Sequence, residues 1–424
     1  MLTTNEADKI LLTKCFSINI VILCLSLHNT SFFPSFLCFH SLTSPQHKLH
    51  NCSEPDLRAK MGRQTIELVK GCGSNEEIVE VLKAVASDFG DVIDDVSSLV
   101  VVPVKGGMTN EVFQIKWPTK SDGLLRRVLV RLYGEGVDIF VNREDEIQNF
   151  EWMSKHGQGP LLLGHFTNGR VEEFLNARTL SAPDLRDPAI SALIATKMRE
   201  FHNLQVPGAK KAHIWQRLRN MLNHAKRLCS PKDVMTFGLD NLHADINMLE
   251  VLLSEEYQEI GFCHNDLHYG NIMMDEEQKT ITFIDYEFAS HNPIAYDLAY
   301  HFCTMEGNFD SDKSHTIRSS NYPGLEERRR FIRIYLSSDG NKPSNIEVEQ
   351  LVNAAEKYNP ACYIFFGLWG LLWDAVGTID FDCKEYAKQI FQLYWLRKPT
   401  VLDSDSSYII SQDGIVNSLQ APLT

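Results

Sequence analysis

Apolar and polar positions follow strand-like and helix-like periods in the first part of the chain. Helical spacing of apolar residues predicts a helix over 75–85. Continuous apolar runs at Leu99–Val104 and Val128–Tyr133 are typical of buried strands, and Gly169–Leu175 also reads as a strand. Between these strands, the run from Arg143 to His156 is helical in pattern. This region is therefore predicted to be a small sheet accompanied by helices.

From residue 187 onward the pattern becomes mainly helical. Ala189–Leu204 has apolar residues at helical spacing, and Asp187 followed by Pro188 suits the start of a helix. Asp240–Ser254 is a second amphipathic helix. The sequence of the body contains no internal repeat and no low-complexity linker. We therefore predict two lobes in tight succession rather than two tethered domains.

The first 60 residues differ from the rest of the chain. Ile10–Leu27 is mostly apolar, and an aromatic, Ser-rich run follows it. Phe16–Leu27 fits loosely the apolar core of a signal peptide, roughly 7–15 residues, but it is short for a membrane span of about 20 apolar residues. We interpret residues 1–60 as a disordered or non-native extension, with Met61 beginning an ordinary sequence. A targeting segment is the alternative, and no stable membrane insertion is expected.

Bulk composition narrows the classes of partner. The formal net charge is −14, which argues against nucleic acid or an anionic membrane as the main partner. An acidic body suits a cationic substrate, although solubility alone also explains it. The ten cysteines contain no Cys-x-x-Cys pair, so the sequence indicates neither a disulfide framework nor a zinc site. Reduced thiols and a cytoplasmic location are expected.

The residues that carry chemistry concentrate between Phe262 and Glu287. Asp266 is followed five residues later by Asn271, and a short apolar strand then ends at Asp285. Protein kinases use this order: His-Arg-Asp, an Asn five residues after the Asp, and then Asp-Phe-Gly. Here Asn265 replaces the Arg and Tyr-Glu replaces Phe-Gly. The pattern predicts phosphoryl transfer to an acceptor other than a protein.

Phosphoryl transfer explains why these residue types occur together. The reaction needs a carboxylate near the acceptor hydroxyl, divalent metal at the phosphates, and donors around them. Asp266 is placed to orient or deprotonate the acceptor, while Asn271 and Asp285 supply the oxygen ligands that Mg²⁺ prefers. ATP and Mg²⁺ are therefore the predicted cofactors. His264 and Asn265 are expected to brace the loop by hydrogen bonds.

A glycine turn between two strands is the candidate phosphate loop. Paired glycines let backbone N–H groups approach phosphate oxygens, and neighbouring Thr and Asn side chains add donors. An ordinary hairpin turn is the alternative, because the pattern is neither of the common phosphate-loop motifs. The residues of this turn are Gly106, Gly107, Met108, Thr109 and Asn110.

A single cation inside an apolar strand is the second nucleotide-binding candidate. Arg131 could reach the nucleotide phosphates as the strand Lys of protein kinases does, paired with Glu146 on the following helix. A solvated strand Arg and an exposed helix-start carboxylate are the alternatives. The strand from Gly169 to Leu175 leads out of this region, and its backbone groups lie where a kinase hinge would hold adenine.

Several segments together resemble the choline/ethanolamine kinase family, most strongly its plant choline kinases. The similarity runs from about residue 78 to Pro399. The segments that carry it are His264–Asn271, Ile284–Asn292, Tyr296–Ala299, Gly106–Asn110, Leu129–Gly134 and Phe366–Gly370.

The resemblance implies an α+β, protein-kinase-like two-lobed fold. It places a small β-rich, nucleotide-binding N-lobe at 61–175 and a large, mainly helical C-lobe with the catalytic loop and amine pocket at 176–400. Residues 401–424 form a tail. The implied reaction is ATP plus choline giving phosphocholine and ADP, the first step of the CDP-choline route to phosphatidylcholine. Ethanolamine is a further candidate substrate, and a homodimer remains open.

By the same resemblance, Asp266 is the catalytic base, and Asn271 and Asp285 hold Mg²⁺. Arg131 and Glu146 would serve the phosphates, and Glu173 and Leu175 would face adenine. The substrate site would be an aromatic box, with Asp266 and Glu287 also beside the substrate. The aromatic residues that fall on it are Phe288, Phe309, Phe366, Trp369, Phe381 and Tyr386.

The aromatic residues can also be interpreted without the resemblance. Phe365, Trp369 and Trp373 recur every four residues on one helix face, a stripe that usually packs in a core. Aromatic faces also attract a quaternary ammonium, which has no hydrogen bond to donate. Ethanolamine's primary ammonium would instead need several acceptors. The box therefore favours choline.

This chain departs from the family's pattern at the substrate site. Thr304 stands where the family carries Glu, and His268 replaces a Gln. Phe288, Phe309 and Phe366 replace Tyr or Trp. These changes should weaken the grip on the cation and leave the ATP and Mg²⁺ sites intact. The alternatives are an ethanolamine kinase, a kinase of another hydroxylated amine, or a catalytically weak pseudokinase or binding module.

Overall fold

The computed structural model describes residues 75–104, 110–121, 123–134, 139, 141–254, 259–377 and 381–402. These residues belong to one unit, 55–424. The predictions for residues 1–60, for most of the tail 401–424, and for Gly106, Gly107, Met108 and Thr109 lie outside them.

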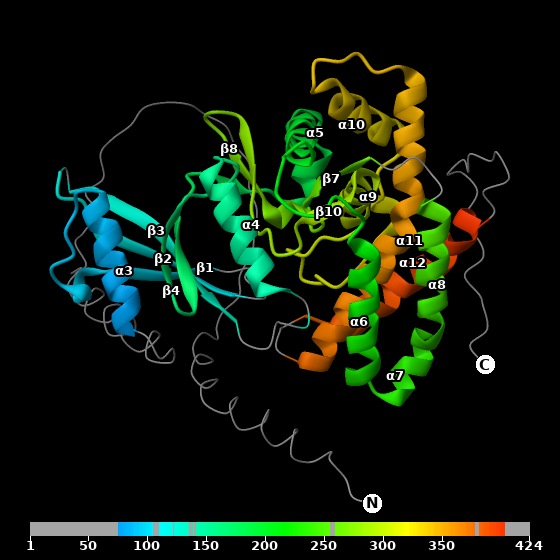
Figure 1. Ribbon diagram of the computed structural model, residues 1–424, viewed down its shortest axis with the longest axis horizontal. Coiled ribbons are helices and arrows are strands. Elements are labelled where there is room, and N and C mark those ends of the chain that lie inside the picture. The colour runs from blue at the N-terminus through cyan, green and yellow to red at the C-terminus, as the bar shows by residue number, and fades with distance from the viewer. Residues whose placement is uncertain are drawn as a thin grey trace, which may run out of the picture. The chain divides into compact units, whose positions relative to one another are not determined.

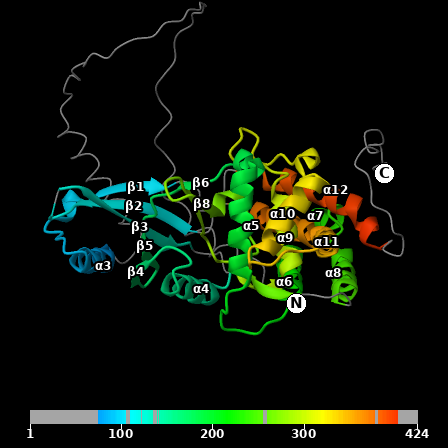
Figure 2. The same ribbon diagram turned by 90° about the horizontal axis from the view of Figure 1, so that it is seen from above.

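A five-stranded antiparallel sheet forms the first part of the described chain (Figure 1). Its strands lie in the order β1-β2-β3-β5-β4, which can be followed in Figure 2. Helix α3 packs against β4, and α4 lies between the sheet and the helical region. The predicted helix from residue 75, the apolar strands and the helix from Arg143 are all confirmed. Their bounds are α3 (Asn75–Asp88), β1 (Val100–Val104), β2 (Asn110–Pro118), β3 (Leu125–Tyr133), α4 (Arg143–Lys155), β4 (Leu162–Phe166) and β5 (Gly169–Glu173).

Alternation along the strands gives this sheet one buried face. Ile115 and Trp117 of β2 are buried, as are Val128 and Val130 of β3, because side chains two residues apart share a face. These residues and the apolar stripe of α3, which includes Leu82, form a small hydrophobic core. Arg131, which lies between Val130 and Leu132 on β3, therefore points to the opposite face of the sheet.

The rest of the described chain is mainly helical and packs around a second, larger core (Figure 2). The fold class, α+β with a sheet region and a helical region, is confirmed. The helices are α5 (Pro188–His202), α6 (Ile214–Leu228), α7 (Pro231–Thr236), α8 (Leu239–Ser254), α9 (Ile294–Thr304), α10 (Leu325–Ser337), α11 (Asn345–Val376) and α12 (Cys383–Leu402). Short 3-10 turns cover Val96–Ser98, Ala182–Arg186, Tyr269–Asn271 and Ser319–Asn321.

The predicted start of α5 is confirmed in detail. The Asp187 side chain accepts from the backbone N–H groups of Ala189 and Ile190, and Pro188 occupies the first turn. Close packing elsewhere depends on glycine: a Cβ on Gly367 of α11 would lie 2.7 Å from the Phe391 ring of α12.

None of the helices in the described residues has the length and apolarity needed to cross a membrane.

Two short sheets hold the central motif. Strand β7 (Ile260–Cys263) pairs with β10 (Ser290–Pro293), and β6 (Arg178–Thr179), β8 (Ile272–Asp275) and β9 (Thr280–Phe283) form the other sheet. The short apolar strand predicted before Asp285 is confirmed as β9, although it ends at Phe283. Asp266 follows β7, and Asp285 follows β9 by two residues.

Candidate active site

Asp266 is half-buried, and both of its carboxylate oxygens accept hydrogen bonds. The Tyr300 hydroxyl donates to Oδ1 at 2.7 Å, and the Asn271 amide donates to Oδ2 at 3.0 Å. The pKa of Asp266 is raised to about 7. Burial is the largest cause and nearby Asp285 adds to the rise, while His264 and these two hydrogen bonds oppose it. The structure thus brings Asp266 and Asn271 together as predicted.

The backbone before Asp266 adopts a conformation that is rare for residues other than glycine. Asn265 has φ of 62°, and such residues persist only where surrounding contacts hold them. Asp297 of α9, fully buried, accepts from the N–H groups of His264 at 2.9 Å and Asn265 at 2.7 Å. The Asn265 amide also donates to the carbonyl of Phe288 at 2.8 Å. The prediction that Asn265 braces the loop is confirmed.

Asp285 shares this left-handed conformation, with φ of 68°. His264 Nε2 lies 2.9 Å from the carbonyl oxygen of Ile284, so the second predicted brace is also present. The Tyr286 hydroxyl donates to the carbonyl of Phe283 at 2.5 Å. A Cβ at residue 159 would lie 2.2 Å from that hydroxyl, so only Gly159 fits there. On α4, Asn149 donates to the carbonyl of Ala289 at 2.9 Å and so joins α4 to this segment.

The Asp285 and Asn271 side chains fit a magnesium ion. Asp285 Oδ1 is buried and has no hydrogen-bond partner among the described residues. The side-chain amide N–H of Asn271 donates to Asp266, so the side-chain oxygen of Asn271 is left as the ligand atom. Carboxylate and amide oxygens are suitable Mg²⁺ ligands, and a buried polar atom without a partner is costly unless something binds it.

A buried charge network occupies one end of the five-stranded sheet. Arg131 donates to Glu172 at 2.7 Å, and Arg170 donates to the same oxygen at 2.8 Å. Arg170 also donates to Glu146 at 3.0 Å. The prediction that Arg131 pairs directly with Glu146 is therefore wrong: Arg131 pairs with Glu172, and Glu146 pairs with Arg170. Strand register gives the reason: Arg131 lies directly opposite Arg170, so a carboxylate must neutralise both cations.

The other predicted nucleotide residues lie near the ends of the strands. Asn110 begins β2, and its side-chain oxygen accepts from Arg143 at 3.1 Å, so that oxygen is engaged within the protein. Glu173 ends β5, where its backbone N–H donates to Leu161 at 2.8 Å. Leu175 is half-buried just beyond the strand. Their roles toward nucleotide stay predictions.

The predicted aromatic residues form two clusters. In the first, here called the Trp369 cluster, ring centroids lie 5.4 to 6.5 Å apart. The second, here called the Tyr300 cluster, joins the Asp266 partner to rings on α11. The Trp369 cluster is His268, Tyr269, Phe309, Trp369, Phe381 and Tyr386, and the Tyr300 cluster is Phe288, Tyr300, Phe365 and Phe366.

Two departures from the family's pattern are also placed. Thr304, at the end of α9, is buried, and its hydroxyl donates to the His301 carbonyl at 2.8 Å. Burial lowers the pKa of His268 to about 4, so the imidazole is neutral beside the Trp369 cluster. Glu287 is half-buried one residue before Phe288. No contact of these three residues tests their role toward substrate.

Similarity to known proteins agrees with this geometry. The family model described as "Choline/ethanolamine kinase" matches residues 101–395. The chain belongs to the choline/ethanolamine kinase family. It is 58% identical to the probable choline kinase 2 of Arabidopsis thaliana over 77% of this chain and 93% of the relative. It is 31% identical to the probable ethanolamine kinase of the same plant over 78% of this chain and 88% of the relative.

The fold is also that of the family. A crystal structure of a choline kinase from Cryptosporidium parvum superposes with a TM-score of 0.65 at 22% identity, covering 77% of this chain and 97% of that one. The match supports the protein-kinase-like architecture predicted for this member of the family.

Sequence reasoning missed several polar residues around the site. Asp297, Glu172 and Tyr300 each contact a predicted residue, yet none was a candidate. Arg217 of α6 was also missed: its guanidinium lies 5.4 Å from the Phe288 ring centroid, and Nη2 donates to the Ser290 hydroxyl at 3.4 Å. Nη1 is buried without a hydrogen-bond partner among the described residues, and burial lowers the pKa of Arg217.

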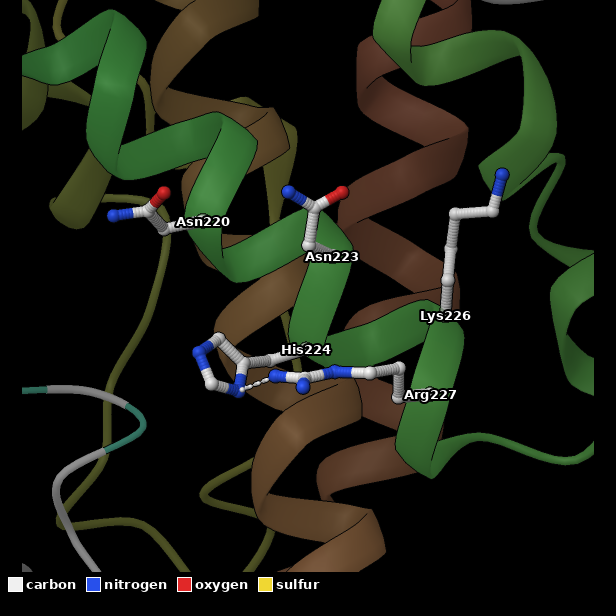
Figure 3. A pocket seen from close by; sticks show the side chains of 5 residues that line it. All are labelled: Asn220, Asn223, His224, Lys226 and Arg227. Carbon is white, nitrogen blue, oxygen red and sulfur yellow. Dashed lines mark hydrogen bonds between the residues drawn. The ribbon is translucent and has the colours of Figure 1, made fainter.

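A polar hollow on the surface of α6 is lined by no predicted site residue (Figure 3). His224 and Arg227 contact each other there at 2.9 Å, and Lys226 pairs with Asp240. Its remaining lining residues are Asn220 and Asn223. These groups are mutually paired or exposed, so the family's chemistry is better placed at Asp266.

Proposed function

We propose that this protein transfers the γ-phosphoryl group of ATP to the hydroxyl of choline, giving phosphocholine and ADP. The observation that carries the proposal is the arrangement at Asp266. The half-buried Asp266 carboxylate is oriented by Tyr300 and Asn271, and Tyr300 itself belongs to an aromatic cluster. Family membership supports the reaction class. The name of the 58% identical plant relative supports choline as the acceptor.

The chain's own residues would act on the acceptor hydroxyl. Asp266 holds that hydroxyl and takes its proton as the oxygen bonds to the γ-phosphorus. The bond from the γ-phosphorus to the bridging oxygen breaks, and ADP leaves. A carboxylate fixed at both oxygens needs little reorganisation during this step.

Asn271 and Asp285 would hold Mg²⁺ through their side-chain oxygens. When bound, Mg²⁺ neutralises charge on the nucleotide phosphates. At the sheet, Arg131 would act on the same phosphates: Asp285 is among the charges that raise the pKa of this guanidinium, so the two side chains are neighbours. Glu172 and Glu146 keep that cation compensated within the sheet.

Preference for choline follows from the chemistry of the two aromatic clusters. A trimethylammonium group gains from ring faces and needs no acceptor. Phe288, Phe309 and Phe366 carry no hydroxyl, so they offer a primary ammonium no hydrogen-bond acceptor. Ethanolamine is therefore expected to be the poorer substrate. A cytoplasmic location remains a prediction from the cysteine pattern.

A substrate panel tests the proposal directly. The full chain is incubated with Mg-ATP and, separately, choline, dimethylethanolamine, methylethanolamine and ethanolamine. Products are quantified by mass spectrometry. We expect kcat/KM to be highest for choline and to fall as methyl groups are removed. A chain that binds ATP and phosphorylates none of the four contradicts the proposal, and a reversed order would identify an ethanolamine kinase.

A further inference from the structure

Tyr300 joins Asp266 directly to the aromatic rings of α11. It lies on α9 with 3% of its surface exposed. Its hydroxyl donates to Asp266 Oδ1 at 2.7 Å. Its ring lies edge-on to Phe366 at 4.7 Å and to Phe365 at 5.7 Å. The two ends of one rigid side chain therefore contact the two parts of the proposed site.

We propose that Tyr300 is a positioning residue that fixes the rotation of the Asp266 carboxylate and sets it relative to the amine site. This inference rests on the proposed function. Asn271 holds only Oδ2, and a carboxylate held at one oxygen can still rotate about its Cβ–Cγ bond. Tyr300 holds Oδ1, so the carboxylate cannot rotate, and the free lone pairs of the Asp266 oxygens stay pointed toward the acceptor hydroxyl. The hydroxyl acts through Asp266 and takes no part in bond formation.

The ring has a separate effect from the hydroxyl. A substrate hydroxyl must reach the same carboxylate that the Tyr300 hydroxyl reaches, so the phenol and the acceptor are neighbours. Choline is short, with two carbons between oxygen and nitrogen, so its ammonium stays near the base. Tyr300 and Phe366 therefore form an aromatic surface beside Asp266, and methyl groups on nitrogen would pack there.

Tyr296 provides a matched control. It lies one turn earlier on α9 and is fully buried, but its hydroxyl has no hydrogen-bond partner among the described residues. Tyr300→Phe and Tyr296→Phe each remove one buried hydroxyl and leave the ring. Only the first removes a contact to Asp266. A general loss of packing or stability would appear in both variants.

Steady-state kinetics with choline and with Mg-ATP test the role of the hydroxyl. We expect Tyr300→Phe to lower kcat roughly ten-fold, the rate equivalent of one hydrogen bond to a charged group. KM for choline and for ATP should stay within about two-fold, and Tyr296→Phe should match the wild type. Equal kcat in Tyr300→Phe and wild type would overturn the proposal.

Tyr300→Leu tests the ring. We expect KM to rise more for choline than for ethanolamine, relative to Tyr300→Phe, because the methyl groups lose a packing surface. Equal rises for both amines would remove the ring's role. Failure of the proposed function is seen earlier and separately, because the wild type would then phosphorylate no amine. If the wild type phosphorylates choline and the Tyr300 variants have the same kcat and KM as the wild type, only the inference about Tyr300 is rejected.

Discussion

The catalytic loop and the Trp369 cluster are neighbours built from different kinds of contact. Around the loop, buried polar groups meet at hydrogen-bond distances, from Asp297 to the backbone of Asn265 and from Tyr300 to Asp266. In the Trp369 cluster, rings meet at 5.4 to 6.5 Å, and each ring touches two or more others. The conformation of the catalytic loop thus depends on individual hydrogen bonds, whereas the Trp369 cluster depends on many ring contacts together.

This difference implies different responses to mutation. Removing one member of a buried hydrogen bond leaves its partner unpaired, so the cost is large and local. Removing one ring from a cluster leaves the remaining faces in place, so the cost is modest and shared. Loop variants should therefore lose the reaction, and cluster variants should lose affinity for the amine.

Asp266→Asn should have the largest effect. The amide keeps the size of the side chain but cannot accept the acceptor's proton, so kcat should fall roughly a thousand-fold. ATP binding, measured by calorimetry, should be unchanged because the base does not hold nucleotide. Asp312→Asn, an exposed change, is the control. Residual kcat within ten-fold of wild type would show that another group acts as the base.

Asp297→Asn should destabilise the backbone of the catalytic loop at His264 and Asn265. Asp297 accepts from two loop N–H groups, and His202 Nε2 lies 3.0 Å from Oδ2, so an amide there places N–H donors against N–H donors. The free energy of unfolding should fall by about 3–5 kcal/mol, as measured by denaturant titration. Asp240→Asn, which breaks an exposed pair, should cost less than about 1 kcal/mol. Similar costs for the two variants would contradict the comparison.

Glu306 sharpens the comparison because it is a carboxylate whose charge reaches the Trp369 cluster at Tyr386. It is buried, accepts from Tyr363 at 2.7 Å and pairs with Arg397 at 3.0 Å. Burial raises the pKa of Glu306 to about 7 against the opposing effects of Arg397 and Tyr363, and Glu356 adds to the rise. The folded protein thus binds this proton more tightly than the unfolded chain does.

The stability contributed by Glu306 is therefore full below pH 4.5 and is lost as the pH rises through 7. We expect a loss of about 2–3 kcal/mol over that window, read from denaturant midpoints across pH. Glu306→Gln should make this slope shallower and leave the part due to Asp266, whose pKa is also raised to about 7, whereas Glu80→Gln, an exposed change, should leave the whole slope intact. An unchanged slope in Glu306→Gln would mean that Arg397 keeps the carboxylate ionised.

The part of the site that sequence could predict is the part with fixed residue types and spacing. Asp266, Asn271 and Asp285 were candidates because proton transfer and Mg²⁺ binding admit few side chains. The structure brings Asp266 and Asn271 together, and the roles of all three stay proposals. Asp297 lay within a segment used for the family resemblance, but its role was not predicted. Its partners include two backbone N–H groups, which have no side-chain signature in sequence.

Residues whose roles depend on register or on complete burial could not be predicted in the same way. Glu172 replaced Glu146 as the partner of Arg131 because β3 and β5 place two arginines opposite each other. The sequence did offer one signal: Arg170 and Glu172 are two residues apart on the same strand, so their side chains point to the same face of the sheet. Tyr300 lies on α9, where every residue is buried, so hydrophobic periodicity does not show which tyrosine meets Asp266.

Trp369→Leu should have the smallest effect and tests the collective side of the comparison. Trp369 lies 5.9 Å from Tyr386 and 6.2 Å from Phe381, so two rings remain when it is removed. KM for choline should rise several-fold, about 1 kcal/mol, with kcat and KM for ATP within two-fold. Trp395→Leu, at an exposed tryptophan of α12, is the control. If Trp369→Leu instead lowered kcat as strongly as Asp266→Asn, substrate recognition and chemistry would depend on one coupled structure, and the division between the two regions would fail.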